Sequence, residues 1–259
     1  MIIDSHCHVS DVWYEPVETL LHEMDRNGVD KAVLVQLLGQ FNNEYQQQCF
    51  ARYPDRFRSV VGIDAEADDA VDTLYRLADQ GAVGVRLRPE ARSPGSDPLA
   101  IWRSAQERGL AISCVGSMAM FLAPKFAAIL QELDAAPVVL EHLGGIARPD
   151  SCENKPGIMD LARFDNVYLK IPGLGQLTPR ARIFNARQRP LSDDAGEWLL
   201  EAVKNFGADR LMWGSDFPPV AAREGYGNAL RWSRDALSHL KESDIDKLYG
   251  NVALRVFGF

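Results

Sequence analysis

The chain has 259 residues and a net charge of −8, from 28 Lys and Arg against 36 Asp and Glu. Hydrophobic residues make up 46% and charged residues 25%, which is ordinary globular usage and excludes disorder as the main state. The acidic balance argues against nucleic acid as the main partner. No apolar stretch approaches the length needed to cross a bilayer, so no membrane partner is expected.

Eight short, β-rich apolar runs recur along the chain. Most of them are continuously apolar rather than alternating, as expected for strands buried on both faces of a parallel sheet. They comprise residues 1–5, 31–36, 59–63, 83–87, 111–115, 137–141, 167–171 and 210–213.

Stretches with helical periodicity lie between these runs, and three of them end at Gly28, Gly81 and Gly109, the usual place of a C-terminal cap. Eight strands alternating with helices in roughly 250 residues predict a (β/α)8 TIM barrel, an α/β fold with one domain over residues 1–259. A doubly wound sheet is disfavoured, because no Gly-rich phosphate loop follows the first strand. The predicted helices cover residues 15–27, 68–80, 97–108, 124–133 and 194–206.

The longest break in this rhythm is an insertion at about 172–193, which is too long for a simple connection. It is basic in an acidic protein. Such a charge run is usually a solvated face, but at the active-site end it could also be a lid that recruits an anion. The arginines concerned are Arg180, Arg182, Arg187 and Arg189.

The four cysteines indicate a reducing compartment. None of them forms a CxxC pair, and the N-terminus lacks the basic start and long apolar run of an export signal. We therefore expect a cytoplasmic protein with reduced thiols at Cys7, Cys49, Cys114 and Cys152.

Polar residues stand at the predicted C-terminal ends of three strands, where a barrel of this type has its active site. His6 and His8 occupy positions i and i+2 of the first strand and point to the same face. His142 follows the sixth strand, and Asp216 follows the eighth. Taken alone, His142 could be a hydrogen-bonded core histidine and Asp216 a helix N-cap. Taken together, the four residues predict a site on the barrel axis.

The chain resembles the amidohydrolase superfamily, in its amidohydrolase-2 branch of TIM-barrel metal-dependent hydrolases. The resemblance covers essentially the whole chain, and its motifs are short but specific in combination. They read IDSHCH (3–8), GVRL (84–87), VLEHLG (139–144), NVYLK (166–170), LMWGSDFP (211–218) and YGNVALRVF (249–257).

The resemblance implies roles for these residues. His6, His8 and Asp216 match the metal ligands of the superfamily, and three ligands suffice for a catalytic divalent metal such as Zn²⁺ with an open position for water. Asp216 also matches the general base, and His142 matches a residue that polarises or orients the substrate. The pattern departs at the fifth strand, where residues 112–117 contain no histidine and Cys114 is interpreted as a buried apolar thiol. Some similar lactonases work without a metal, so direct proton abstraction by Asp216 stays open.

Three basic residues are candidates for substrate binding. Arg86 and Arg88 lie two apart at the end of the fourth strand and should face one side, where guanidinium groups suit a substrate carboxylate or sulfonate. The alternative is an ion pair with a neighbouring carboxylate. Lys170, near the end of the seventh strand, has the same two interpretations.

We therefore expect an enzyme of this superfamily, a hydrolase acting on a small, anionic or sugar-derived lactone. Water activated by Asp216 attacks the carbonyl, with or without a divalent metal. Non-oxidative decarboxylation of an aromatic or unsaturated acid is the alternative, although the relatives with that activity generally retain the fifth-strand histidine. A non-catalytic ligand-binding barrel is a third interpretation. The expected partner is a small-molecule substrate, and a homo-oligomer is compatible with the sequence.

Overall fold

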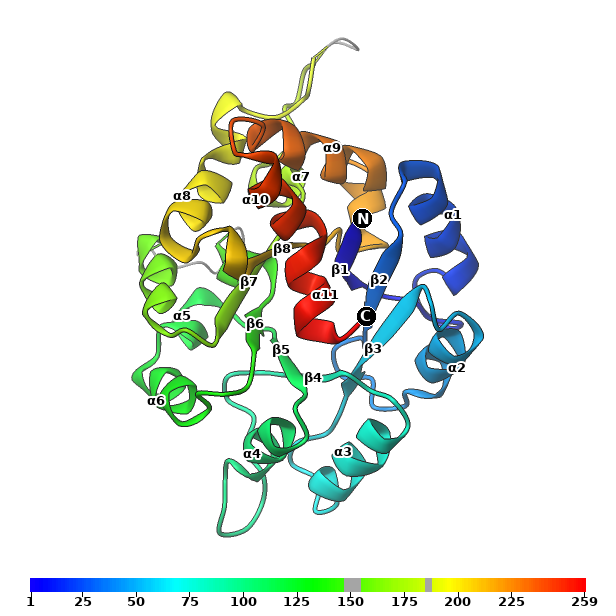
Figure 1. Cartoon of the computed structure of the whole chain (residues 1–259), viewed down its shortest axis with the longest axis vertical. Helices are drawn as coiled ribbons and strands as arrows, with labels where there is room; N and C mark the ends of the chain where they lie inside the picture. Colours follow the sequence, from blue (N-terminus) through cyan, green and yellow to red (C-terminus); the bar gives the residue numbers. More distant parts are fainter. Residues whose placement is uncertain (147–154, 185–187) are drawn as a thin grey trace.

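All eight apolar runs form strands in the structure, a computed structural model that describes residues 1–146, 155–184 and 188–259. The strands are parallel and follow one another in sequence order around a nearly closed single-domain (β/α)8 barrel, as expected (Figure 1). Cys152 and Arg187 lie outside the described residues. The strands are β1 (Ile3–Cys7), β2 (Lys31–Val35), β3 (Phe57–Gly62), β4 (Gly84–Leu87), β5 (Ala111–Cys114), β6 (Val138–Leu140), β7 (Val167–Ile171) and β8 (Leu211–Trp213).

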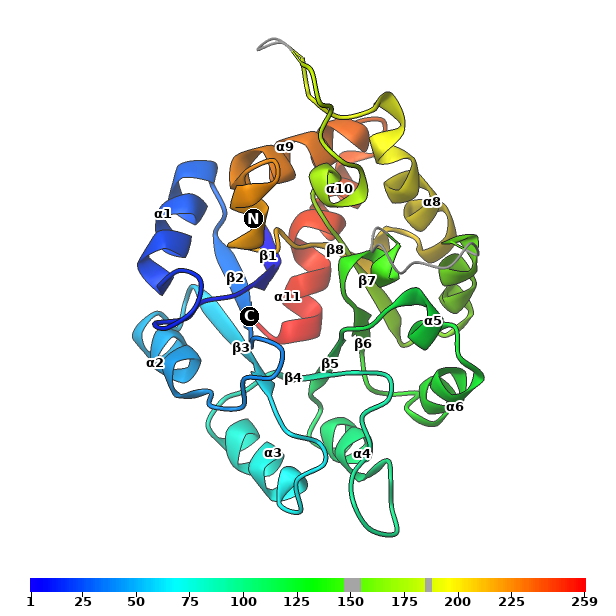
Figure 2. The ribbon, with the colours of Figure 1, turned by 180° about the vertical axis from the view of Figure 1, so that it is seen from behind.

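Helices surround the barrel and cover its outer face (Figures 1 and 2). Gly28 ends the first helix in the left-handed region with a φ of 68°, and Gly109 follows the fourth with a φ of 63°, as their position before a strand predicts. None of the described helices is long and apolar enough to span a bilayer. The helices are α1 (Val17–Asn27), α2 (Glu44–Arg52), α3 (Ala70–Asp79), α4 (Ala100–Glu107), α5 (Met118–Phe121), α6 (Pro124–Glu132), α7 (Leu174–Leu177), α8 (Glu197–Phe206), α9 (Tyr226–Ala236), α10 (Glu242–Asp246) and α11 (Val252–Phe257).

The barrel closes between β1 and the segment that follows β8. Two backbone hydrogen bonds cross this seam, from Asp216 N to His6 O at 2.9 Å and from His8 N to Phe217 O at 2.8 Å. The buried carboxylate of Asp4 strengthens the seam, because its Oδ1 accepts the backbone N–H of both His6 (3.1 Å) and Ser215 (2.9 Å). The same contacts that close the sheet therefore bring the HxH motif and Asp216 together.

The inside of the barrel is apolar at its N-terminal end. Inward-facing side chains such as Ile3, Val60 and Met212 form one buried cluster there, and the C-terminal helix α11 packs against it through Val252 and Phe257. This helix lies across the ring of strands (Figure 1) and is seen behind the ring in the opposite view (Figure 2). The N-terminal end of the barrel interior is thus filled by apolar side chains, as in other barrels of this type. The polar groups of the site lie toward the C-terminal ends of the strands.

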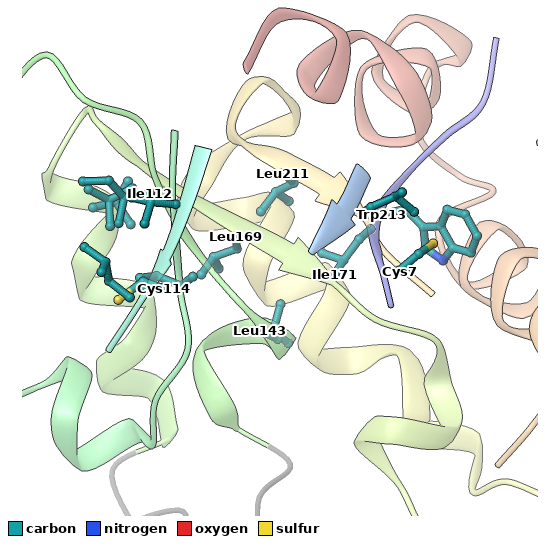
Figure 3. Packing of buried hydrophobic residues seen from close by; sticks show 14 of the residues in the cluster. Cys7, Ile112, Cys114, Leu143, Leu169, Ile171, Leu211 and Trp213 are labelled. Carbon is teal, nitrogen blue, oxygen red and sulfur yellow. The ribbon is translucent and has the colours of Figure 1, made fainter. Parts of the chain in front are cut away.

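The outward-facing side chains of the strands form the larger core, between sheet and helices. Figure 3 shows part of it, including Cys114 of β5, Leu169 of β7, and Cys7 close to Trp213. Both thiols are fully buried, and burial raises the pKa of each well above its ordinary value. The interpretation of Cys114 as an apolar thiol therefore agrees with its position. The described cysteines Cys7, Cys49 and Cys114 are all free.

The insertion starts with the short helix α7 and then extends outward from the barrel (Figures 1 and 2). Its described arginines, Arg180, Arg182 and Arg189, are exposed, and none of them lines the cleft at the barrel mouth. Of the two interpretations, the structure favours a solvated face for these three residues. The start of the insertion, at α7, reaches the site through Gln176.

Candidate active site

The C-terminal end of the barrel carries a cleft of about 550 Å³ lined by His8, His142 and Asp216. The barrel places the HxH motif as the sequence predicts, since the rings of His6 and His8 meet edge to face with centroids 4.8 Å apart. Oδ1 of Asp216 lies 3.8 Å from Nε2 of His6 and 3.6 Å from Nε2 of His8. The His142 ring packs against that of His6, also at 4.8 Å. The four residues singled out in the sequence are therefore neighbours.

His6, His8 and Asp216 provide a donor set for a divalent cation, with ligand atoms all within 4.8 Å of one another. His8 is well prepared, because its Nδ1 lies 2.7 Å from the carbonyl oxygen of Val35 and must donate there, leaving the Nε2 lone pair free. Nε2 of His6 is buried and has no hydrogen-bond partner among the described residues. Its Nδ1 faces the amine of Lys170, which can accept that proton only when Lys170 is neutral.

A buried ion pair lies next to this set, inside the barrel. Arg86 contacts both carboxylate oxygens of Glu141, with Nε to Oε1 at 3.0 Å and Nη2 to Oε2 at 2.6 Å, and its Nη1 donates to the Gln36 carbonyl at 2.8 Å. Ser113 donates its hydroxyl to Oε1 of Glu141 at 2.7 Å. Of the two interpretations of Arg86, the structure favours the ion pair. His6, Glu141 and His142 also lie close enough together to hold a metal ion. A cation bound there would compete with Arg86 for the Glu141 carboxylate.

Lys170 is also buried, and its side-chain nitrogen lies 2.9 Å from Nδ1 of His6 and 2.8 Å from the Ser113 hydroxyl. It therefore acts on the site through His6, and its contact with substrate stays a prediction. Arg88 differs from Arg86 although both border an adjoining cleft of about 410 Å³. It is exposed because it lies beyond the end of β4, and it stays a candidate for binding an anion.

Burial and charge set the protonation states of these groups. Burial would raise the pKa of Glu141, but the positive charges of Arg86 and Lys170 lower it to about 2. Burial lowers the pKa of Lys170 to about 8, against the attraction of Glu141. Burial would raise the pKa of Asp216, but the proximity of His8, His142 and Arg223 outweighs burial and holds the pKa well below its usual range. Asp216 is therefore ionised at neutral pH.

Two residues that the sequence did not single out orient the reactive groups. Gln176, on α7, directs its amide nitrogen to Nδ1 of His142 at 3.0 Å and to Oδ2 of Asp216 at 3.5 Å. The carboxylate can only accept, so the Gln176 amide donates, and Nδ1 of His142 accepts. Because burial lowers the pKa of His142, the ring is neutral and carries its proton on Nε2. Arg223 donates to Oδ2 of Asp216 at 2.8 Å, which leaves Oδ1 for the cleft.

The backbone is strained at the same positions. Among the described residues, four non-glycine residues have a positive φ, and three of them, Tyr14 (73°), His142 (52°) and Asp216 (60°), line the cleft. The fourth, Leu143, is adjacent to His142. Such conformations cost of order 1–3 kcal/mol each and concentrate at functional sites. The strain therefore supports a functional role for this cleft, independently of residue type.

The sequence profile of the amidohydrolase family matches residues 3–259. The chain belongs to the amidohydrolase family. The match over residues 3–259 identifies the chain as an enzyme of the amidohydrolase superfamily. No match is found among curated proteins.

Solved structures of this family share the fold. A putative 2-pyrone-4,6-dicarboxylic acid hydrolase from Pseudomonas putida has 24% identity and a TM-score of 0.76, over 99% of this chain and 97% of that chain. An amidohydrolase from Burkholderia multivorans with bound zinc has 20% identity and a TM-score of 0.78, over 100% and 99%. A 5-carboxyvanillate decarboxylase from Sphingomonas paucimobilis has 14% identity and a TM-score of 0.67, over 100% and 99%. At these identities the likeness extends to the barrel alone.

We expect Glu141→Gln to lower the free energy of unfolding by about 3–5 kcal/mol, because it leaves the Arg86 guanidinium buried without a counter-charge. The matched control is Glu18→Gln, which removes an exposed pair with Arg52 and should cost less than about 1 kcal/mol. The folded-state pKa of Glu141 lies below its ordinary 4.5, so its contribution is present above about pH 5 and is lost as the pH falls toward 2. Urea unfolding at several pH values measures both effects, and equal losses for the two variants would contradict the assignment.

We expect ¹⁵N NMR of histidine-labelled protein to show His142 neutral, with the proton on Nε2. Gln176→Glu should move that proton to Nδ1, because a carboxylate at this position can only accept. The exposed His22 serves as an internal control, and His142→Asn assigns the signal. A wild-type protein with Nδ1 already protonated would show that Gln176 does not set the tautomer.

Proposed function

We propose that the protein is a hydrolase of a small lactone, either anionic or derived from a sugar. The observation that carries this proposal is the pairing of an ionised carboxylate with a neutral imidazole donor in one cleft. Asp216 has Oδ1 as a proton acceptor and His142 has an Nε2–H as a proton donor, 3.7 Å from Oε2 of Glu141, and both side chains line the cleft. Hydrolysis of a cyclic ester needs these two functions together.

The reaction follows from these groups. Asp216 accepts a proton from water as the water oxygen bonds to the carbonyl carbon. The Nε2–H of His142 stabilises the negative charge that develops on the carbonyl oxygen. When the ring C–O bond breaks, the leaving oxygen takes up the proton that Asp216 accepted, which restores the carboxylate of Asp216. The new carboxylic acid releases its own proton to solvent, so the products are one carboxylate, one hydroxyl and one proton. Arg223 and Gln176 keep Oδ2 of Asp216 occupied, so the acceptor is Oδ1.

We further propose that His6, His8 and Asp216 hold a divalent cation, best Zn²⁺. Such a metal would polarise a bound oxygen as a Lewis acid. The support is the donor set itself and the unpartnered Nε2 of His6. In addition, the lowered pKa of Lys170 makes its neutral form accessible, as ligation through His6 Nε2 requires. If the substrate is anionic, the exposed Arg88 is its proposed contact, since Arg86 is already bonded to Glu141.

Non-oxidative decarboxylation is the second candidate. Relatives of similar fold are described as decarboxylases, so the fold is compatible with both reactions. Decarboxylases of similar sequence generally retain a histidine on the fifth strand. In this chain β5 instead places Ser113 next to the site, with its hydroxyl bonded to Glu141 and Lys170. The absence of that histidine favours hydrolysis. A panel of lactones and aromatic acids separates the two, since loss of CO₂ from an acid without hydrolysis of any lactone would decide for decarboxylation.

We expect Asp216→Asn to lower kcat by at least roughly a hundredfold on the lactone that the panel selects, because the amide cannot accept the proton of the attacking water. Circular dichroism should show an intact fold. Asp68→Asn, an exposed carboxylate on the barrel surface, is the matched control and should leave kcat unchanged. Near-normal turnover by a folded Asp216→Asn protein would remove Asp216 from the mechanism.

We expect protein equilibrated with Zn²⁺ and then dialysed to retain about one ion per chain by plasma mass spectrometry, as a three-ligand site requires. His8→Ala should lose this ion, while His22→Ala, a change at an exposed histidine of α1, should retain it. Full hydrolytic activity of the metal-free protein would show that Asp216 acts without a metal.

A further inference from the structure

Exposed apolar side chains gather beside the mouth of the barrel. Among the described residues nine large hydrophobic side chains are exposed, and five of them lie on only two loops, after β1 and after β2. Monomeric proteins rarely leave such side chains clustered at one place unless something binds there. The five are Val12, Trp13, Tyr14, Leu38 and Phe41.

Three of these residues line the same cleft as the reactive groups. Trp13, Tyr14 and Leu38 border it together with His8, His142 and Asp216. The Tyr14 ring lies nearly parallel to the imidazole of His8, with an interplanar angle of 29° and centroids 6.2 Å apart. Trp13 extends this surface, with its ring centroid 6.0 Å from that of Tyr14. A molecule held at His142 and Asp216 therefore contacts an aromatic wall, which is formed by the rings of Trp13 and Tyr14.

The aromatic wall is held in place by its own turn. The hydroxyl of Ser10 accepts the backbone N–H of Val12 at 3.2 Å and of Trp13 at 3.0 Å, and the backbone N–H of Ser10 donates to the Glu15 carbonyl at 3.0 Å. The backbone of Tyr14 has a φ of 73°, in the left-handed region, which residues with bulky side chains seldom adopt. Trp13 is nonetheless 67% exposed. An ordered but uncovered aromatic pair is suited to a ligand, since little entropy is lost on contact.

We propose that Trp13, Tyr14 and Leu38 form a subsite for a flat apolar or aromatic group of the substrate, next to its reactive carbonyl. This inference rests on the proposed hydrolysis for the position of that carbonyl. Of the two proposed kinds of lactone, it favours one with an aromatic or apolar group over one derived from a sugar. A polyol needs several hydrogen-bonding partners. Much of the described lining of the cleft is apolar, from Leu37, Leu38, Val115 and Pro219, and its Arg86 is already bonded to Glu141 and Gln36.

The test compares two lactones that share a six-membered ring: dihydrocoumarin, which carries a fused aromatic ring, and δ-valerolactone, which does not. Trp13→Ala should lower kcat/KM for dihydrocoumarin about tenfold, the scale of one well-packed aromatic contact, and lower it far less for δ-valerolactone. Tyr14→Asn removes the second ring while tolerating the left-handed backbone, and it should act in the same direction. Phe184→Ala, at an exposed aromatic residue of the insertion, is the matched control.

A binding measurement separates this proposal from the proposed function. Calorimetry with 3-(2-hydroxyphenyl)propanoate, the product of dihydrocoumarin hydrolysis, should show binding that Trp13→Ala weakens about tenfold. If that acid binds in this way but no lactone is hydrolysed, the subsite stands and the proposed function fails. Equal effects of Trp13→Ala on both lactones, or unchanged binding of the acid, would overturn the subsite. So would a concentration-dependent dimer that Trp13→Ala dissociates, because a second copy would then cover this surface.

Discussion

The site depends on the seam that closes the barrel. Two backbone hydrogen bonds join the end of β1 to the segment after β8, and the residues that make them are His6 with Asp216 and His8 with Phe217. Three reactive side chains therefore have their backbone fixed by the closure of the sheet itself. The carboxylate of Asp4 reinforces this arrangement by bonding to the backbone on both sides. A shift of register at the seam would separate the imidazoles from the carboxylate, so folding and site assembly are one event.

Two basic side chains, Arg86 and Lys170, are buried in the barrel next to the site. Charged groups in a barrel interior are costly unless they are paired and hydrogen-bonded. Arg86 and Lys170 satisfy this condition through Glu141, Ser113 and His6, and together they make a polar layer between the apolar N-terminal end and the cleft. This layer fixes the orientation of His6 from below. It also means that the charge of the site is set by residues that a ligand does not need to touch.

The fold could be predicted from the sequence because the strands are continuously apolar and the helices end at glycines. The helix α2 was not predicted, since only Gln46 and Cys49 on it are buried and its apolar stripe is correspondingly weak. The HxH motif and Asp216 were found because strand ends are recognisable. Alternation along a strand indicates which face a residue points to but not how deep it lies, so the sequence could not show that Lys170 is buried against His6.

The same limit explains the other residues of the site. Arg86 and Arg88 share a face in the sequence pattern, but β4 ends at Leu87, so one lies inside the barrel and the other beyond it. Gln176 could have been noticed as a polar residue soon after β7, although nothing in its neighbourhood points to His142. Arg223 gives no such signal, because its contact with Asp216 depends on the path of the chain after β8.

Helix α11 closes the N-terminal end of the barrel. Phe257 and its neighbours fill that end with buried side chains, so in the described part of the chain the cleft lined by Asp216 and His142 lies at the opposite end. A ligand in this cleft lies between the carboxylate and the solvent at the mouth. The terminal helix thus links the exchange of the site's protons with solvent to the binding and release of its ligands.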